Sequence, residues 1–156
     1  GFCRGKSPQR LLPVKITLHH IEELRFEAGT EDHRVTVDAT AGEEDQPCAG
    51  MTPPQLFAAA VGACILEFVA NSCRLRQIDF QHLSLTLETE ELDRPRRLGP
   101  LRATLCIEPS PPESVKRRLL GGARHATWVN TLGRPPEVHV SFVDCGQGDG
   151  TGSLAA

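Results

Sequence analysis

The fold is decided by Leu56-Phe-Ala-Ala-Ala-Val-Gly-Ala-Cys-Ile-Leu-Glu-Phe-Val-Ala70, which as a helix would be apolar on every face except at Glu67. A helix that is hydrophobic all round is buried, in a protein core or in a membrane. Thr52 can cap such a helix and Pro53 suits its first position, so we expect it to run from Pro53 to about Arg76. Cys64 lies roughly 16 Å from the predicted start, at about 1.5 Å per residue. Its thiol is therefore either inert packing or the centre of a buried site.

Composition limits the function classes. The chain has 156 residues, enough for one domain with a real core, and its net charge of -3 gives no basic surface for nucleic acid. The apolar run is broken by Glu67 and falls short of the ~18 residues of a spanning helix, so we expect no membrane partner. The amino end lacks a hydrophobic signal core, which favours a cytoplasmic protein. We predict flexible tails at residues 1–13 and 144–156 around a single domain at residues 14–143.

The cysteines predict free thiols rather than a metal site. None of the six, at positions 3, 48, 64, 73, 106 and 145, forms a Cys-x-x-Cys pair, so we expect no metal and no cofactor. A disulfide framework would need an oxidising compartment. Cys73 is expected to be packing and Cys106 to lie near the surface. Cys48, in the loop before the helix, is either incidental or a thiol that swings toward Cys64.

Alternating apolar and polar residues predict antiparallel strands. They occupy residues 14–18, 24–28, 35–37, 83–87, 101–107 and 138–142, with a turn at 29–32 and a hairpin loop at 93–100. Ser110 has the form of a capping residue for a short helix that Gly121 and Gly122 would end, and a further helical turn or two follows at 123–132. Strands and helices in segregated runs indicate an α+β domain. One sheet covers only one side of an apolar helix, so a second subunit is the simplest source of the other layer, and we expect a homodimer.

Two motifs carry a resemblance to a known family. Gly50-Met-Thr-Pro-Pro-Gln-Leu-Phe-Ala-Ala-Ala-Val-Gly-Ala-Cys64 resembles the helix-opening motif of the OsmC/Ohr family, the osmotically inducible and organic-hydroperoxide-resistance proteins. Ala123-Arg-His-Ala-Thr-Trp-Val-Asn-Thr-Leu132 is similar to the family's second cysteine segment, and Pro135–Val140 fits its final strand. The resemblance covers about residues 14–143. It implies antiparallel sheets wrapped around a long buried central helix in an intertwined homodimer.

The resemblance also implies a chemistry. The best-known members reduce organic hydroperoxides with a cysteine at the position of Cys64, which becomes a sulfenic acid and is resolved by a second cysteine. A glutamate and an arginine help to form the thiolate. Here the second cysteine position falls on Ala126 and the glutamate position on Pro54. The arginine matches no motif, since Arg25 and Arg34 lie on early strands outside it.

The remaining candidates for chemistry lie near Cys64 in the sequence or in the second motif. Glu67 follows Cys64 by three residues on the same helix face, where an ionised carboxylate opposes the thiolate and a protonated or hydrogen-bonded one does not. Asn71 continues this polar stripe. His125 adjoins Ala126 and is either a base or hydrogen-bond donor at the site, or a helix-end residue that makes a backbone contact.

Two hypotheses from different classes follow. In the first, Cys64 reduces small organic hydroperoxides without the usual second cysteine, and an external thiol reductant resolves the sulfenate. In the second, the protein is a degenerate, non-catalytic homodimer whose interface pocket binds a small apolar ligand. Cys64 favours the first hypothesis, and Pro54 and Ala126 favour the second.

Overall fold

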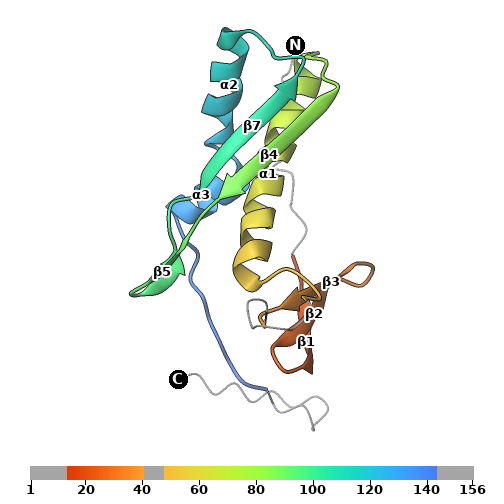
Figure 1. Ribbon diagram of the computed structural model, residues 1–156, viewed down its shortest axis with the longest axis vertical. Helices are drawn as coiled ribbons and strands as arrows, with labels where there is room; N and C mark the ends of the chain where they lie inside the picture. Colours follow the sequence, from red (N-terminus) through yellow and green to blue (C-terminus); the bar gives the residue numbers. More distant parts are fainter. Residues whose placement is uncertain (1–13, 41–47, 144–156) are drawn as a thin grey trace, which may run out of the picture. The chain divides into compact units, whose positions relative to one another are not determined.

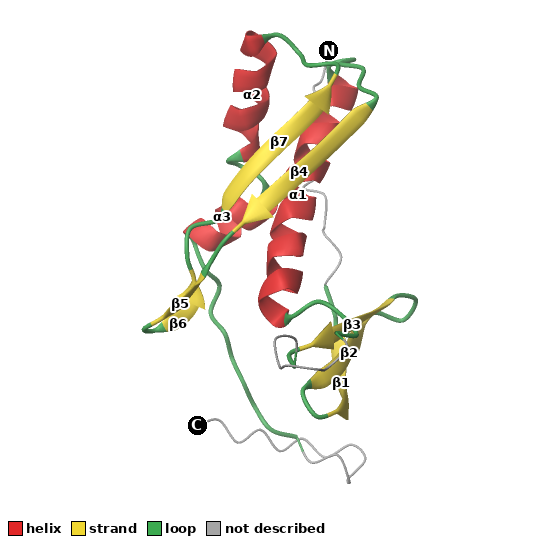
Figure 2. Cartoon of the chain, viewed as in Figure 1, coloured by secondary structure: helices red, strands yellow, loops and turns green. Residues whose placement is uncertain are grey.

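The structure is a computed structural model, and it describes residues 14–40 and 48–143 (Figures 1 and 2). Within these residues three helices and antiparallel strands form the predicted α+β fold. The described chain divides into two compact units. One contains the residues up to Ala63 together with Ser84–Cys106, and the other contains Cys64–Leu83 together with the residues from Ile107 on. The predicted tails, with Cys3 and Cys145, lie outside the described residues, and the domain limits stay a prediction.

The first unit opens with a three-stranded antiparallel sheet in the order β1-β2-β3. The strands are β1 (Thr17–Glu22), β2 (Arg25–Gly29) and β3 (Arg34–Asp38). The last two lie within one residue of the predicted ranges, whereas β1 begins three residues later and ends four residues later than the predicted 14–18. Their register places Leu18 opposite Ala28 and Phe26 opposite Val37. Ala28 and Val37 are buried, whereas every residue of β1 is exposed.

Asp38, at the end of β3, is a fully buried carboxylate with four hydrogen-bond donors. The hydroxyl and backbone N–H of Thr40 donate to its Oδ1 atom, at 2.5 and 3.0 Å. The N–H of Ala49 and the guanidinium of Arg25 donate to Oδ2, at 2.9 and 3.3 Å. These hydrogen bonds, that of the Thr40 hydroxyl above all, hold the pKa of the Asp38 carboxyl well below its usual range, against the opposing effect of burial. One side chain thus fastens residues on both sides of the 41–47 segment.

Helix α1 (Pro53–Leu75) begins and ends as the sequence predicts, within one residue. Thr52 Oγ1 accepts a hydrogen bond from the N–H of Gln55, and Gln55 Oε1 accepts one from the N–H of Thr52, which is a reciprocal capping box. At the other end Gln77 has a positive φ of 54°, and the N–H of Ile78 donates to the carbonyl of Cys73. That is the Schellman geometry, which satisfies carbonyls left open by the last turn.

Burial of α1 within the single chain is partial. Val61, Val69 and Cys73 are buried, while Cys64 is half-buried and Leu75 is 68% exposed. Burial of the remaining faces between two subunits therefore stays a prediction. The complete helix has 23 residues and is longer than the apolar run considered alone, and by length and hydropathy it meets the minimum for a membrane span. The core helices of soluble proteins meet the same minimum.

Strands β4 (His82–Glu88) and β7 (Arg102–Glu108) pair with each other, and Figure 1 shows them running in opposite directions. This confirms the predicted hairpin. Its loop contains a small second hairpin that the sequence analysis did not predict, made of β5 (Glu91–Asp93) and β6 (Arg96–Leu98). In the first unit α1 lies close to β4 at Gly62. A Cβ atom added to this glycine would lie 3.3 Å from Leu85 Cδ2.

The second unit holds α2 (Glu113–Ala123) and α3 (Thr127–Gly133), with Val69, Cys73, Leu119 and Ala126 as its buried apolar residues. The prediction that Ser110 caps α2 is wrong. Pro112 is the N-cap residue and no side chain caps the helix. The physical reason is that a residue before proline avoids the helical region, so the chain stays extended through Pro111. Gly122 also lies inside the last turn of α2 rather than ending it.

The predicted final strand at 138–142 is absent from the described chain. Val138, Val140 and Phe142 are 83%, 89% and 95% exposed. Alternation shows only that a segment can pair, and a strand forms only where another strand offers its free backbone groups. Among the described residues this segment pairs with no strand.

A candidate thiol site

A pocket of about 180 Å³ lies beside Cys64 in the second unit. Its residues come from one face of α1 and from the junction between α2 and α3. They are Cys64, Glu67, Phe68 and Asn71 on the helix, and His125, Ala126 and Thr127 at the junction. The pocket therefore brings together all three residues for which the sequence suggested a catalytic role, namely Cys64, Glu67 and His125. Ala126, the position that the resemblance assigns to a second cysteine, lies beside His125 on the wall formed by the junction.

Helical geometry explains the first wall. Positions i, i+3, i+4 and i+7 share one face of an α-helix, which puts Glu67, Phe68 and Asn71 on the same side as Cys64. Glu67 is exposed and forms no ion pair within the described residues. Phe68 is half-buried and meets α2 at Gly122, where a Cβ atom would lie 2.5 Å from Phe68 Cζ. The absence of a side chain at Gly122 lets the ring sit between α2 and the pocket.

Backbone hydrogen bonds shape the second wall. The N–H of His125 donates to Gly122 O at 2.8 Å and that of Ala126 to Ala123 O at 3.1 Å, which turns the chain sharply after α2. Asn130 then holds the turn from α3, with its N–H on Ala126 O at 3.0 Å and its Nδ2 on His125 O at 2.9 Å. His125 is thus fixed through its backbone, and its imidazole forms no hydrogen bond or ion pair within the described part of the chain.

The other described cysteines differ from Cys64 in surroundings. Cys73 is fully buried, and burial raises the pKa of its thiol, partly offset by the charge of Arg76. This agrees with a packing role. Cys106 is exposed on β7, as predicted. Cys48 is also exposed, with its Sγ atom 2.8 Å from Gly50 O, and the hypothesis that it swings toward Cys64 stays a prediction.

The early arginines are engaged by carboxylates of the first unit. Arg25 pairs with Glu22 and with Asp38, the latter at 3.3 Å, and Arg34 lies 3.3 Å from Glu27. Both side chains hold the sheet together. Because both arginines are paired with carboxylates, the structure gives no support to the idea that Arg25 or Arg34 activates the thiol.

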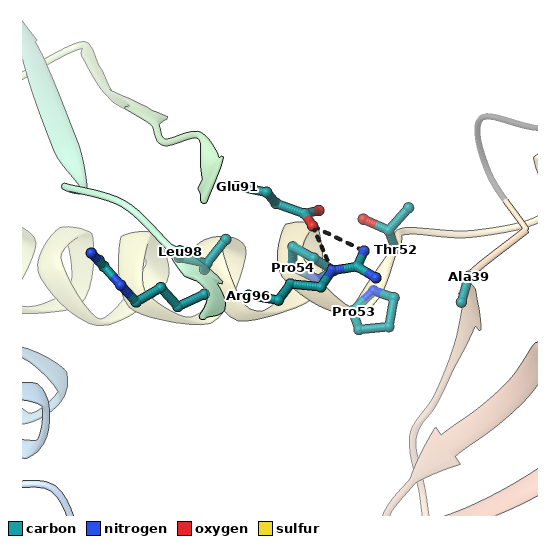
Figure 3. Close-up of a pocket in the computed structure, with 8 residues that line it drawn as sticks. Ala39, Thr52, Pro53, Pro54, Glu91, Arg96 and Leu98 are labelled. Carbon is teal, nitrogen blue, oxygen red and sulfur yellow. Dashed lines mark hydrogen bonds and ion pairs between the residues drawn. The ribbon is translucent and has the colours of Figure 1, made fainter. Parts of the chain in front are cut away.

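A larger pocket of about 450 Å³ lies in the first unit at the start of α1 (Figure 3). Thr52, Pro53 and Pro54 line one side of it, and the β5–β6 hairpin contributes an ion pair between Arg96 and Glu91 at 3.0 Å. Pro54 stands on this wall where the resemblance implies a glutamate. The pocket contains no thiol, so we assign the candidate site to the smaller pocket that holds Cys64. No cluster of three metal-binding side chains occurs among the described residues.

Comparison with known proteins identifies the fold. Residues 42–141 match the sequence model of the family described as OsmC-like protein. The chain belongs to the OsmC family. No curated protein matches the sequence.

Solved OsmC-family structures are similar over most of their length. An OsmC-like protein from Mycoplasma pneumoniae has a TM-score of 0.68 at 17% identity and covers 80% of this chain and 89% of its own. An organic hydroperoxide resistance protein OsmC from Legionella pneumophila gives 0.62 at 19% identity, with 81% and 93% covered. OhrB of Bacillus subtilis, an organic hydroperoxide resistance protein, gives 0.57 at 16% identity, with 79% and 93% covered. At such low identity these likenesses show the OsmC fold alone.

Two pocket residues were not singled out from the sequence of this OsmC-family chain. Phe68 follows Cys64 by one helical turn, so its spacing could have indicated it, although an apolar residue in an apolar run carries no chemical signal. Thr127 is the first residue of α3 and enters the pocket because the chain turns at Ala126. Nothing in the local sequence specifies that turn.

Proposed function

We propose that this protein is a thiol-dependent reductase of small organic hydroperoxides that uses Cys64 without a second cysteine. The observation that carries the proposal is the pocket that unites Cys64 with Glu67, His125 and Ala126. Family membership supports it, and the Legionella pneumophila and Bacillus subtilis proteins of the same fold are named for organic hydroperoxide resistance.

The chemistry has three balanced steps. The Cys64 thiolate attacks the terminal peroxide oxygen, the O–O bond breaks, and the substrate leaves as an alcohol after taking up one proton. Cys64 becomes a sulfenic acid. An external thiol then displaces water to form a mixed disulfide, and a second equivalent releases Cys64 as a thiol together with the oxidised reductant. Because Ala126 has no sulfur, an intramolecular disulfide at that position is impossible.

Glu67 and His125 are the proposed proton carriers. Both line the pocket with Cys64, and the leaving alkoxide needs one proton. A carboxyl group in its acid form, or an imidazolium, provides that proton and avoids placing a second negative charge beside the thiolate. We place the reaction in a cytoplasmic homodimer, where cellular thiols act as the reductant.

A second candidate function has its own supporting observation. Pro54 replaces the glutamate that hydroperoxide-reducing members carry, and the carboxylate of Glu67 lies in the pocket with the thiol. Both features disfavour a thiolate. In that case Phe68 and Ala126 form the apolar wall of a pocket that binds a small apolar ligand without chemistry.

One assay separates the two functions. Consumption of cumene hydroperoxide is followed with dithiothreitol or dihydrolipoamide as reductant, for the wild type and for Cys64→Ser. The proposal expects turnover in the wild type and its loss in the variant, while Cys106→Ser, at an exposed thiol, serves as a matched control that keeps turnover. An inactive wild type, or equal activity in wild type and Cys64→Ser, refutes the reductase and leaves the ligand-binding alternative.

A further inference from the structure

Asn71 has an amide whose orientation is set by its neighbour on α1. Arg74 Nη2 donates to Asn71 Oδ1 at 2.8 Å. A guanidinium can only donate hydrogen bonds, so the amide atom that faces Arg74 must be the carbonyl oxygen. The two N–H groups of Asn71 Nδ2 are therefore not engaged by Arg74, and no hydrogen bond from them occurs among the described residues. Asn71 lines the pocket that holds Cys64, so this amide is part of the wall of that pocket.

Asn71 also lines two neighbouring pockets of the second unit. The Cys64 pocket contains it, and so does an open groove of about 710 Å³ that continues along α1 to the following loop. The groove is lined by Glu67, Ala70, Asn71, Arg74, Ile78, Asp79 and Phe80. Asn71 is two helical turns from Cys64, about 10 Å along the axis. A molecule with its reacting atom at Cys64 and a body of that length passes the free Nδ2 donor.

We propose that Asn71 determines specificity by donating a hydrogen bond to a neutral acceptor, such as a ketone, ester or hydroxyl oxygen, on the far end of the ligand. This inference rests on the proposed function for the reacting end of that ligand. A carboxylate is the poorer match, because the groove that Asn71 lines has two carboxylates, Glu67 and Asp79, and only one positive charge, that of Arg74. The preferred substrates are therefore uncharged organic hydroperoxides that carry a second oxygen function.

Three substrates of one shape test the proposal. They are cumene hydroperoxide, its para-acetyl derivative and its para-carboxyl derivative, each assayed with wild type, Asn71→Asp and Asn71→Leu. One neutral hydrogen bond changes affinity by about 3- to 10-fold. We expect the para-acetyl compound to have a KM lower than the parent by that factor in the wild type, with kcat unchanged. Both Asn71 variants should bring the KM ratio to about one, since aspartate keeps the shape of the side chain but cannot donate.

A pair of arginine variants tests the orienting contact. Arg74→Met frees the amide and should reduce the preference for the acetyl compound. Arg76→Met removes an arginine that lies outside the groove, next to the end of the same helix, and should leave the preference intact. Equal KM values for parent and acetyl compound in the wild type, or a preference that survives Asn71→Leu, overturn the proposal. A stronger preference for the para-carboxyl compound also overturns it and assigns recognition to Arg74.

Failure of the proposed function is separable from failure of this inference. If the wild type consumes no hydroperoxide, the reductase is refuted, and the corresponding alcohols are then titrated against the wild type. Trp128, the single tryptophan of the chain, follows the pocket residue Thr127 and provides a fluorescence signal. Tighter binding of the para-acetyl alcohol that is lost in Asn71→Leu supports the role of Asn71. Equal dissociation constants for the two alcohols overturn it.

Discussion

Gly122 is the point where the packing of α2 against Phe68 can be tested most directly. An added Cβ atom there would lie 2.5 Å from Phe68 Cζ and 2.6 Å from Cε1, far inside van der Waals contact. At the neighbouring Gly121 the same atom meets nothing within 4 Å. Gly122→Ala should therefore overpack the second unit, and Gly121→Ala provides a matched control with the same chemical change in the same helix.

The expected magnitude follows from two opposing terms. Alanine in place of glycine inside a helix stabilises by about 0.5–1 kcal/mol, which applies to both variants. Overpacking costs about 1–3 kcal/mol and applies to Gly122→Ala alone. The helix term cancels in the comparison, so Gly122→Ala should be about 1–3 kcal/mol less stable than Gly121→Ala. For a chain of this size that difference corresponds to a gap in Tm of roughly 2–12 °C.

Urea unfolding of the two variants and the wild type measures these differences. Phe68 also lines the Cys64 pocket, so displacement of its ring should change the rate at which iodoacetamide alkylates Cys64 in Gly122→Ala and not in Gly121→Ala. Equal stability of the two variants would refute the close packing of α2 on Phe68. Equal alkylation rates would refute the placement of that ring on the pocket wall.

Three further predictions concern the thiol, a buried charge and the assembly. Excess hydroperoxide should carry wild-type Cys64 to the sulfinic state, while Ala126→Cys should divert the product to a disulfide with Cys64, as peptide mapping will show; a wild-type disulfide between Cys64 and Cys48 contradicts this. The pKa of Asp38 is lowered on folding, so its stabilisation is complete above the ordinary aspartate pKa of about 3.9 and is lost as pH falls through the lower folded-state value. Wild-type stability should therefore fall more steeply between about pH 4 and pH 2 than that of Asp38→Asn in urea titrations, and parallel pH profiles would argue against the Asp38 network. Analytical ultracentrifugation at micromolar concentration should show a homodimer, and a stable monomer would end that prediction.

The sequence predicted best those elements whose causes are local. The start of α1 depends on Thr52 and Pro53, and the turn after β2 depends on Gly29, so neighbouring residues were sufficient. Ser110 failed because two prolines after it oppose the helical backbone that a capping box needs. The segment at 138–142 failed for a different reason. Alternation reports the chemistry of a strand but says nothing about whether a partner strand is present.

The candidate site likewise contains residues that the local sequence could group and residues that it could not. Spacing along one helix was enough to group Cys64 with Glu67 and Asn71. Bringing His125 and Ala126 to that face required the family resemblance, because about 60 residues separate them from Cys64 and no local pattern relates the two segments. The close approach of Phe68 to Gly122 could not be predicted from the sequence. A glycine near a helix end predicts the end of the helix, and only the structure shows the aromatic ring beside it.

The Asp38 network has a consequence for engineering the protein. Because one carboxylate holds both Thr40 and Ala49, the two ends of the intervening segment are fixed by contacts that the segment itself does not supply. The entropy of closing a loop rises only slowly with its length. An epitope tag or a fluorescent-label sequence inserted between residues 41 and 47 should therefore leave the first turn of α1 in place, which would provide a site for immobilising or labelling the protein.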